Sequence, residues 1–243
     1  VVCECHPMGR QWLHPIFRSL RGHRTSRVDL SSEPQVARAL GFFFELLGSG
    51  ARLAVPLLPR CAFPFADAEY LMVAFADASG PPPPGVFEPG NPGGGAWTVR
   101  GRVLYFFDNL WTSEELRCLN ISVLEFLVSF WAEVIFSRVS PSATHGLSFT
   151  DNTGAEWSMR RETPYAALMQ RVSARRSCFL AERRLFVYSY RVTSGDNRWA
   201  DMLSRQRRAE VLAEAAALGL TVVDCCSELA ELRDTAWLTS VCA

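Results

Sequence analysis

Two short apolar runs that each end in an aspartate limit the fold of this chain more than any other feature. Residues 71–76 read Leu-Met-Val-Ala-Phe-Ala and lead into Asp77, and residues 147–150 read Leu-Ser-Phe-Thr and lead into Asp151. Runs of this length and composition are typical of buried β-strands. If the two strands lie side by side and parallel, their carboxyl ends meet at one edge of the sheet, which is where open α/β sheets place their sites.

Each aspartate continues one apolar face of its strand, because side chains along a strand alternate between the two faces. Phe75 shares a face with Asp77, and Phe149 shares a face with Asp151. We therefore expect both acids to continue rows of residues that face the core.

Further strand and helix patterns predict a mixed α/β domain around these runs. The expected segments are a hairpin over 95–98 and 102–107, a helix over 121–136, a helical stretch over 153–182 broken near Pro164, a strand over 185–192 and a helix over 197–218. This order predicts a five-stranded sheet, in which a three-strand antiparallel meander is followed by parallel strands, with helices on its faces.

The chain is expected to have three parts. Residues 1–66 are predicted to form a small, mainly helical segment with a helix over 36–47, residues 67–210 the α/β domain, and residues 211–243 the end of the last helix and a tail. A loop rich in Pro and Gly over 81–95 separates the first two strands. The sequence starts with valine and shows no leader pattern, so we expect it to be part of a longer polypeptide.

The composition favours a soluble protein in an intracellular compartment, cytoplasmic or nuclear. With 49% hydrophobic residues among 243, the chain can bury a sizeable core. Its most apolar helical stretch is interrupted by Glu125 and Glu133, so no membrane span is expected. The adjacent Cys225 and Cys226 are poorly placed for a disulfide, which favours a reducing compartment.

The net charge is zero, but the charges are unevenly distributed. Residues 160–208 contain twelve arginines and four acidic residues. Such a basic region suits a polyanionic partner, although a solvated basic helix face would have the same composition.

Two further acids can reach the predicted strand ends. Glu125 falls in the first turns of the helix expected over 121–136, and Asp201 falls in the first turns of the last helix. Carboxylates held close together repel one another unless protons or cations lie between them, and oxygen ligands alone favour Mg²⁺ or Mn²⁺. Two such ions, about 4 Å apart, can activate a water molecule and stabilise the leaving oxygen in phosphodiester hydrolysis.

Each of these acids also has an ordinary structural explanation. An aspartate at a strand end is common in turns, and a glutamate at the start of a helix interacts with the helix dipole. Asp201 can pair with Arg205 at i,i+4. The metal-site interpretation therefore depends on the acids lying together in space.

The strongest motif lies near the end of the predicted domain. Residues 194–205 read Ser-Gly-Asp-Asn-Arg-Trp-Ala-Asp-Met-Leu-Ser-Arg and resemble the Gly-x-x-Asn-x-x-Ala-Asp-x-Leu-Ser-Arg signature that ends the ribonuclease H domain of retroelement reverse transcriptases. Upstream motifs of that family have similar counterparts in the same order, namely Ala76-Asp77-Ala78-Ser79, Gly94-Gly95-Ala96-Trp97, Asn120-Ile121-Ser122-Val123-Leu124-Glu125 and Phe149-Thr150-Asp151-Asn152. The pattern is most similar to that of tyrosine-recombinase retrotransposons of the DIRS kind.

The resemblance implies a ribonuclease H-like fold and cleavage of the RNA strand of an RNA–DNA hybrid. It implies that two divalent ions, Mg²⁺ or Mn²⁺, are bound by four acids, namely Asp77, Glu125, Asp151 and Asp201. It also implies that residues 1–66 correspond to the end of an upstream polymerase module, its thumb or connection, which would be a partner within the same polyprotein.

A nuclease of this class needs little base recognition and reads duplex shape, phosphates and 2′-hydroxyls. We expect phosphate contacts from arginines of the helical stretch after Asp151, namely Arg171, Arg175, Arg176, Arg183 and Arg184. Asn152 is expected to reach a sugar hydroxyl, and Asn197 of the last motif is assigned to the same nucleic-acid interface.

The sequence departs from the family in two places. An insertion over 80–93, beside Asp77, is longer and richer in proline than usual, and no histidine precedes Gly195, where many relatives have one. Three hypotheses therefore stay open. The chain is an active ribonuclease H, a decayed retroelement fragment that binds nucleic acid or a partner chain without cutting, or another nuclease of the same fold, such as an integrase or resolvase, that acts on DNA.

Overall fold

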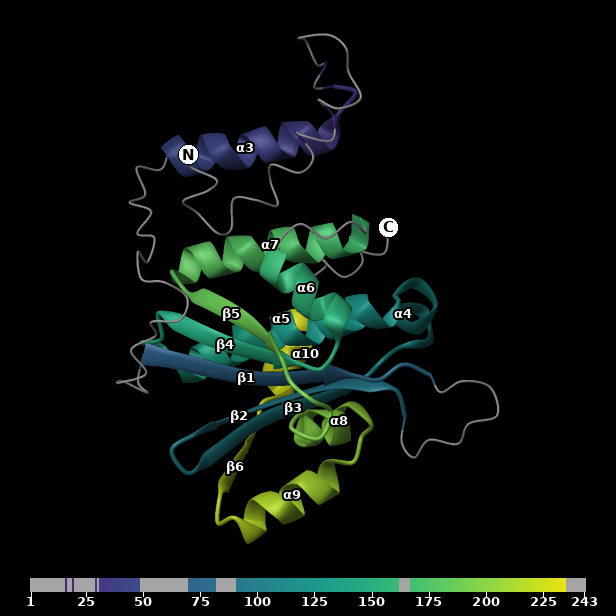
Figure 1. Cartoon of the computed structure of the whole chain (residues 1–243), viewed down its shortest axis with the longest axis vertical. Helices are drawn as coiled ribbons and strands as arrows, with labels where there is room; N and C mark the ends of the chain where they lie inside the picture. Colours follow the sequence, from purple (N-terminus) through teal and green to yellow (C-terminus); the bar gives the residue numbers. More distant parts are fainter. Residues whose placement is uncertain are drawn as a thin grey trace.

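Figure 1 shows the computed structural model of the chain, which describes residues 16, 19, 29, 31–48, 70–81, 91–161 and 167–234. A six-stranded sheet forms its centre, in the order β5-β4-β1-β2-β3-β6. The strands are β1 (Leu71–Ala78), β2 (Gly93–Arg100), β3 (Val103–Leu110), β4 (His145–Thr150), β5 (Phe186–Arg191) and β6 (Thr221–Asp224). The helices are α3 (Pro34–Gly48), α4 (Ser113–Cys118), α5 (Ile121–Val139), α6 (Thr153–Arg161), α7 (Ala167–Arg183), α8 (Arg198–Ser204), α9 (Arg208–Ala217) and α10 (Cys226–Asp234).

The sheet has the predicted antiparallel and parallel parts. β1, β2 and β3 form the antiparallel meander, while β4 pairs parallel to β1 and β5 pairs parallel to β4. In this register Phe75 of β1 lies beside Phe149 of β4, so the carboxyl ends of the two strands lie side by side. The predicted mixed α/β fold, with an antiparallel meander followed by parallel strands as in a ribonuclease H-like sheet, is confirmed.

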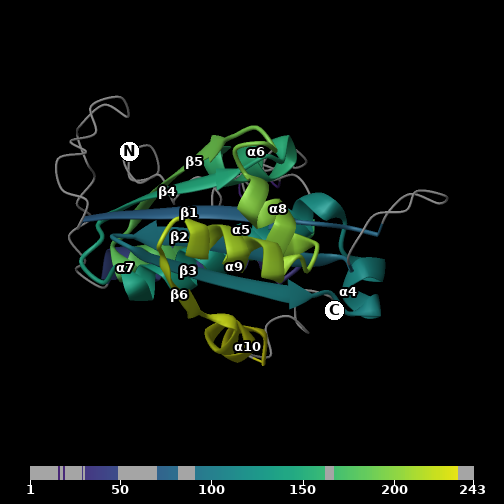
Figure 2. The ribbon, with the colours of Figure 1, turned by 90° about the horizontal axis from the view of Figure 1, so that it is seen from below.

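Helices cover both faces of the sheet. α5 packs along β1, β2 and β4, and α6, α7 and α10 pack against α5. α8 packs on β1, β2 and β3 from the other face, and α9 follows it. In Figure 1, α7 lies above the sheet and α8 and α9 lie below it, and Figure 2 shows the face that α8 and α9 cover.

The larger core lies on the α5 side, and this corrects the expectation about the strand faces. The residues of β1 that face this core are Met72, Ala74 and Ala76, each at most 1% exposed. Asp77 follows the alternate row, on the α8 side, where Phe75 stacks on Trp97 with ring centroids 4.3 Å apart. Because helices cover both sides of β1, both rows are apolar, and the pattern alone does not identify the face of the larger core.

The prediction of five strands was one short, and the predicted tail is part of the fold. β6 pairs parallel to β3, and Cys225 and Leu229 are buried in the larger core. The boundary predicted at residue 210 lies inside α9. The single helix predicted over 197–218 is divided into α8 and α9, and Gln206 between them has a left-handed backbone with φ of 62°.

Most of the N-terminal segment predicted over 1–66 lies outside the described residues. The helix expected over 36–47 is confirmed as α3. The break expected near Pro164 agrees with the end of α6 at Arg161 and the start of α7 at Ala167, although Pro164 itself is not among the described residues. No described helix combines the length and the apolar composition that crossing a bilayer requires.

Glycines at the start of β2 allow α8 to approach the sheet closely. Gly95 is the register partner of Asp77. A Cβ atom on Gly95 would lie 2.3 Å from the Cβ of Leu203 and 2.6 Å from the backbone nitrogen of Ser204. Only a residue without a side chain fits between the sheet and the backbone of α8 at this point.

We predict that Gly95→Ala lowers the free energy of unfolding by about 1–3 kcal/mol, because the added methyl group overpacks a contact with backbone atoms. Urea denaturation measures this change. Gly195→Ala is the matched control, because its nearest atom, Thr193 Oγ1, is 3.7 Å away. A change at Gly95 no larger than that at Gly195 would contradict the close approach of α8.

Candidate metal centre

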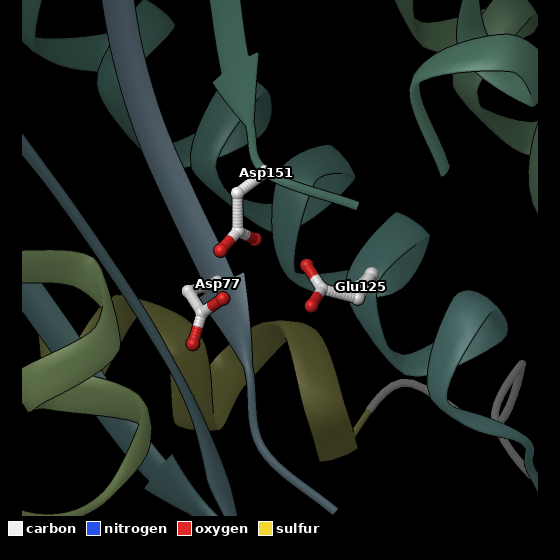
Figure 3. Close-up of side chains that lie close together, drawn as sticks. All are labelled: Asp77, Glu125 and Asp151. Atoms are coloured by element: carbon white, nitrogen blue, oxygen red, sulfur yellow. The ribbon is translucent and has the colours of Figure 1, made fainter. Parts of the chain in front are cut away.

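Three carboxylates converge at the shared end of β1 and β4. They belong to Asp77 on β1, Glu125 on α5 and Asp151 directly after β4, and one oxygen from each lies within 4.8 Å of the others. Figure 3 shows the three side chains pointing toward one another. The predicted convergence of these three acids is therefore present in the structure.

Local structure fixes the element that carries each acid. Asp77 precedes the last residue of β1, and its pairing with Gly95 holds the backbone there. At the start of α5, the side-chain oxygen of Asn120 accepts a hydrogen bond from the backbone N–H of Val123 at 3.1 Å, so Glu125 lies just after a capped first turn.

A hydroxyl group contacts each of the three carboxylates. Thr150 donates to Glu125 Oε2 at 3.3 Å, Ser194 donates to Asp151 Oδ2 at 2.7 Å, and Ser204 donates to Asp77 Oδ2 at 2.5 Å. The sequence interpretation did not assign these three residues to the site. The sequence contains one feature that could have identified them, because each of these residues lies inside a motif that also contains one of the predicted acids.

Burial makes the charged form of this cluster unfavourable. Asp77 is 5% exposed and Glu125 is 3% exposed. Burial is the main cause that raises the pKa of Asp77 to about 7; the hydrogen bond from Ser204 opposes the rise, and the charges of Asp151 and Asp201 add to it. Burial, and then the charges of Asp77 and Asp151, raise the pKa of Glu125 well above its ordinary value.

The donor set fits a hard divalent cation. All three side chains offer carboxylate oxygens, which is the ligand type that Mg²⁺ and Mn²⁺ prefer. A cation between them would replace the protons that burial and mutual repulsion otherwise favour. The geometry and the electrostatics are therefore compatible with divalent metal binding.

Asp201, the fourth predicted ligand, is not in the converging group. Its Oδ1 accepts a hydrogen bond from Arg205 Nε at 2.8 Å, which is the i,i+4 pair considered as its structural explanation. Its charge still contributes to the raised pKa of Asp77, so it lies near the cluster. A ligand role for Asp201 remains a prediction.

Arg176 has a structural role in place of the predicted phosphate contact. It is 2% exposed, and its guanidinium donates two hydrogen bonds to Glu133 of α5, at 2.6 and 2.8 Å. This bidentate ion pair joins α7 to α5 in the interior. The prediction failed because helical periodicity did not show that one of the closely spaced arginines points inward to a buried acid.

The other arginines assigned to phosphate contacts are exposed, and they divide into two groups. Arg171 and Arg175 lie in the first half of α7. Arg183 donates to the carbonyl of Ser137 at 3.1 Å, and Ser137 lies twelve residues beyond Glu125 in α5, or about 18 Å along the helix. Arg183 and the following Arg184 therefore lie toward the amino-terminal ends of β1 and β4, whereas the carboxylates lie at their carboxyl ends.

The two predicted asparagine contacts are involved in local structure. Asn197 is fully buried and donates to the carbonyl of Ala76 at 3.0 Å, so the structure does not place it at a nucleic-acid surface. The side-chain oxygen of Asn152 accepts from the backbone N–H of Ala155 at 2.9 Å at the start of α6. Asn152 is partly exposed, and its proposed contact with a sugar remains a prediction.

The comparisons with known proteins give a likeness in structure, and none in sequence. No protein-family model matches the sequence, and no curated protein matches it significantly. Among solved structures, the chain is similar to the N-terminal ribonuclease H domain of a Mycobacterium tuberculosis protein, determined as a fusion with maltose-binding protein. The two share 17% identity over 60% of this chain and 99% of the matched chain, with a TM-score of 0.39. The fold assignment rests on the strand order described above.

We predict that Arg176→Met lowers the free energy of unfolding by about 3–5 kcal/mol, because the buried Glu133 carboxylate loses its partner. The double variant Glu133→Leu with Arg176→Met is expected to recover most of that loss, since apolar residues can replace a buried pair. Urea denaturation of the single and double variants measures both changes. A double variant as unstable as the single one would contradict this interpretation.

We predict that Asp77 makes the stability of the metal-free protein depend on pH. Asp77 binds its proton more tightly in the folded protein than in the unfolded chain, so its contribution to stability is lost as pH rises from about 4 to about 7. Without added metal, the stability of Asp77→Asn relative to the parent protein should therefore increase between pH 5 and pH 8. Thermal unfolding across that range measures the difference, and a constant difference would argue against a raised pKa.

Proposed function

We propose that the chain is a metal-dependent nuclease that hydrolyses the RNA strand of RNA–DNA hybrids. The observation that carries this proposal is the convergence of Asp77, Glu125 and Asp151 within 4.8 Å. The motif resemblance supports it independently, because these are the acids that the ribonuclease H motifs select.

The roles of the residues follow from their surroundings. Asp77, Glu125 and Asp151 would hold the cations, and Asp201 would join them if its side chain left Arg205. When bound, two Mg²⁺ or Mn²⁺ ions supply a means of activating water and stabilising the leaving oxygen. The hydroxyl groups of Thr150 and Ser194 hold Glu125 and Asp151 in place, which keeps the carboxylate oxygens directed at one point.

The proposed substrate is a nucleic-acid duplex whose shape is read through phosphates and 2′-hydroxyls. Arg171 and Arg175 on α7 are exposed and are the candidates for phosphate contacts. Asn152 directly follows Asp151, so a sugar near the scissile phosphate would come within its reach. By the same resemblance, the natural partner would be the upstream polymerase module of the same retrotransposon polyprotein.

A second candidate function is a module that binds nucleic acid or a partner chain without cutting. The ion pair between Asp201 and Arg205 favours it, because it leaves three acids rather than four at the converging point. Cleavage activity distinguishes the two functions.

We predict that the protein cleaves the RNA strand of an end-labelled RNA–DNA hybrid in the presence of Mg²⁺ or Mn²⁺. Asp151→Asn and Glu125→Gln should each lower the rate by about a thousandfold or more, because cation ligation accounts for several kcal/mol of transition-state stabilisation. Gel analysis of the products measures the rate.

Asp196→Asn is the matched control for this assay. Asp196 is an exposed acid near the site whose Oδ2 accepts a hydrogen bond from Thr193, and asparagine can keep that contact. Its rate should stay within about twofold of the parent, since isolated surface substitutions change free energies by about 0.5 kcal/mol or less. Absence of cleavage together with retained hybrid binding would instead support the second candidate, and cleavage of duplex DNA alone would indicate a nuclease of another specificity.

A further inference from the structure

Ser204, at the end of α8, makes the shortest contact to the carboxylate cluster. It is fully buried, and its hydroxyl donates to Asp77 Oδ2 at 2.5 Å. The same hydroxyl lies 2.9 Å from the carbonyl oxygen of Asp201. A hydroxyl has one proton to donate, and the shorter contact to a carboxylate is the stronger of the two.

We infer that Ser204 is a positioning residue, which fixes the side chain of Asp77 so that Oδ1 is left for a divalent cation. The inference rests on the proposed function, because it concerns how the same site is held. It assigns a role to a serine that the metal-ligand motifs leave without one.

The backbone of Ser204 is itself tied to the end of β1. Ser79 Oγ donates to the carbonyl of Ser204 at 2.7 Å and accepts from the backbone N–H of Gly93 at 3.0 Å. Trp111 Nε1 donates to the carbonyl of Ser79 at 3.2 Å. Ser204 is thus attached to the strand that carries Asp77, two residues beyond the acid.

The start of α8 is tied to the same strand on the other side of Asp77. Asn197 donates to the carbonyl of Ala76 at 3.0 Å. The segment from Asn197 to Ser204 therefore contacts residues 76 and 77 of β1 and Ser79 just after the strand, and Gly95 opposite Asp77 gives it room. Both ends of the segment are fixed relative to the acid that Ser204 contacts.

This arrangement matters for a cation because a carboxylate is free to turn about its last torsion, which has a broad energy profile. A hydrogen bond to Oδ2 removes that freedom before a cation arrives. Partners of this kind orient metal ligands, and their loss lowers metal affinity or activity by about 10- to 100-fold. Ser204 is expected to act on metal affinity through Asp77 without touching the metal.

The test is Ser204→Ala in the full chain, with Mn²⁺ as the probe. Titration followed by the electron paramagnetic resonance of free Mn²⁺ should show an affinity lower by about 10-fold or more. Cleavage of a hybrid should need a correspondingly higher Mn²⁺ concentration, with a smaller effect on the rate at saturation. A role limited to folding would lower the melting temperature without metal and leave the Mn²⁺ affinity unchanged.

Ser129→Ala is the matched control. Ser129 is fully buried one turn beyond Glu125 on α5, and no hydrogen-bond partner for its hydroxyl is found among the described residues. Its Mn²⁺ affinity should equal that of the parent. If Ser204→Ala does not fold, Ser204→Cys keeps a side chain of the same shape, slightly larger and with a weaker donor, and should also lower the affinity.

The outcomes separate this inference from the proposed function. A parent protein that binds and cleaves, with a Ser204→Ala or folded Ser204→Cys variant of equal Mn²⁺ affinity, would overturn the positioning role alone. A parent that binds Mn²⁺ without cleaving any hybrid would overturn the proposed cleavage of RNA–DNA hybrids, while the affinities of the variants would still decide the role of Ser204. A parent that binds no Mn²⁺ would overturn both.

Discussion

The close contact between α8 and the sheet is the interaction on which the carboxylate site depends. Gly95 has no side chain, so the backbone of α8 reaches the sheet directly opposite Asp77. That contact buries Asp77 and delivers the hydroxyl of Ser204. Burial then raises the pKa of Asp77, and the need for a proton or a cation at the cluster follows from it.

Two opposing influences act on the buried acids. Removal from water and mutual repulsion favour protonation, whereas hydroxyl and backbone donors favour the charged form, as Ser204 does for Asp77 and Thr150 for Glu125. For Asp77 and Glu125 the first influence is the larger. A divalent cation would favour the charged form of these acids without moving the backbone, because one oxygen of each carboxylate already lies within 4.8 Å of the others.

Short sequence patterns predicted those parts of the fold and of the site that depend on residues close together in the sequence. The strands that end at Asp77 and Asp151 follow from short apolar runs, and the motifs placed Glu125 beside them. The features that the sequence did not predict depend on contacts between residues that are far apart in the sequence. The inward direction of Arg176 is set by Glu133, 43 residues away, and the contact of Ser204 with Asp77 spans 127 residues. β6 was missed because four residues are too short for a periodic signal.

The sixth strand and the helix that follows it have a consequence for how the domain is made. β6 pairs with β3, which lies more than a hundred residues earlier, and Leu229 of α10 completes the larger core. During synthesis, the emerging chain exposes the edge of β3 and part of the apolar surface of α5 until these last segments leave the ribosome. Because β6 is synthesised more than a hundred residues after β3, the strand edge stays unpaired during translation, as a surface that chaperones or other nascent chains can bind.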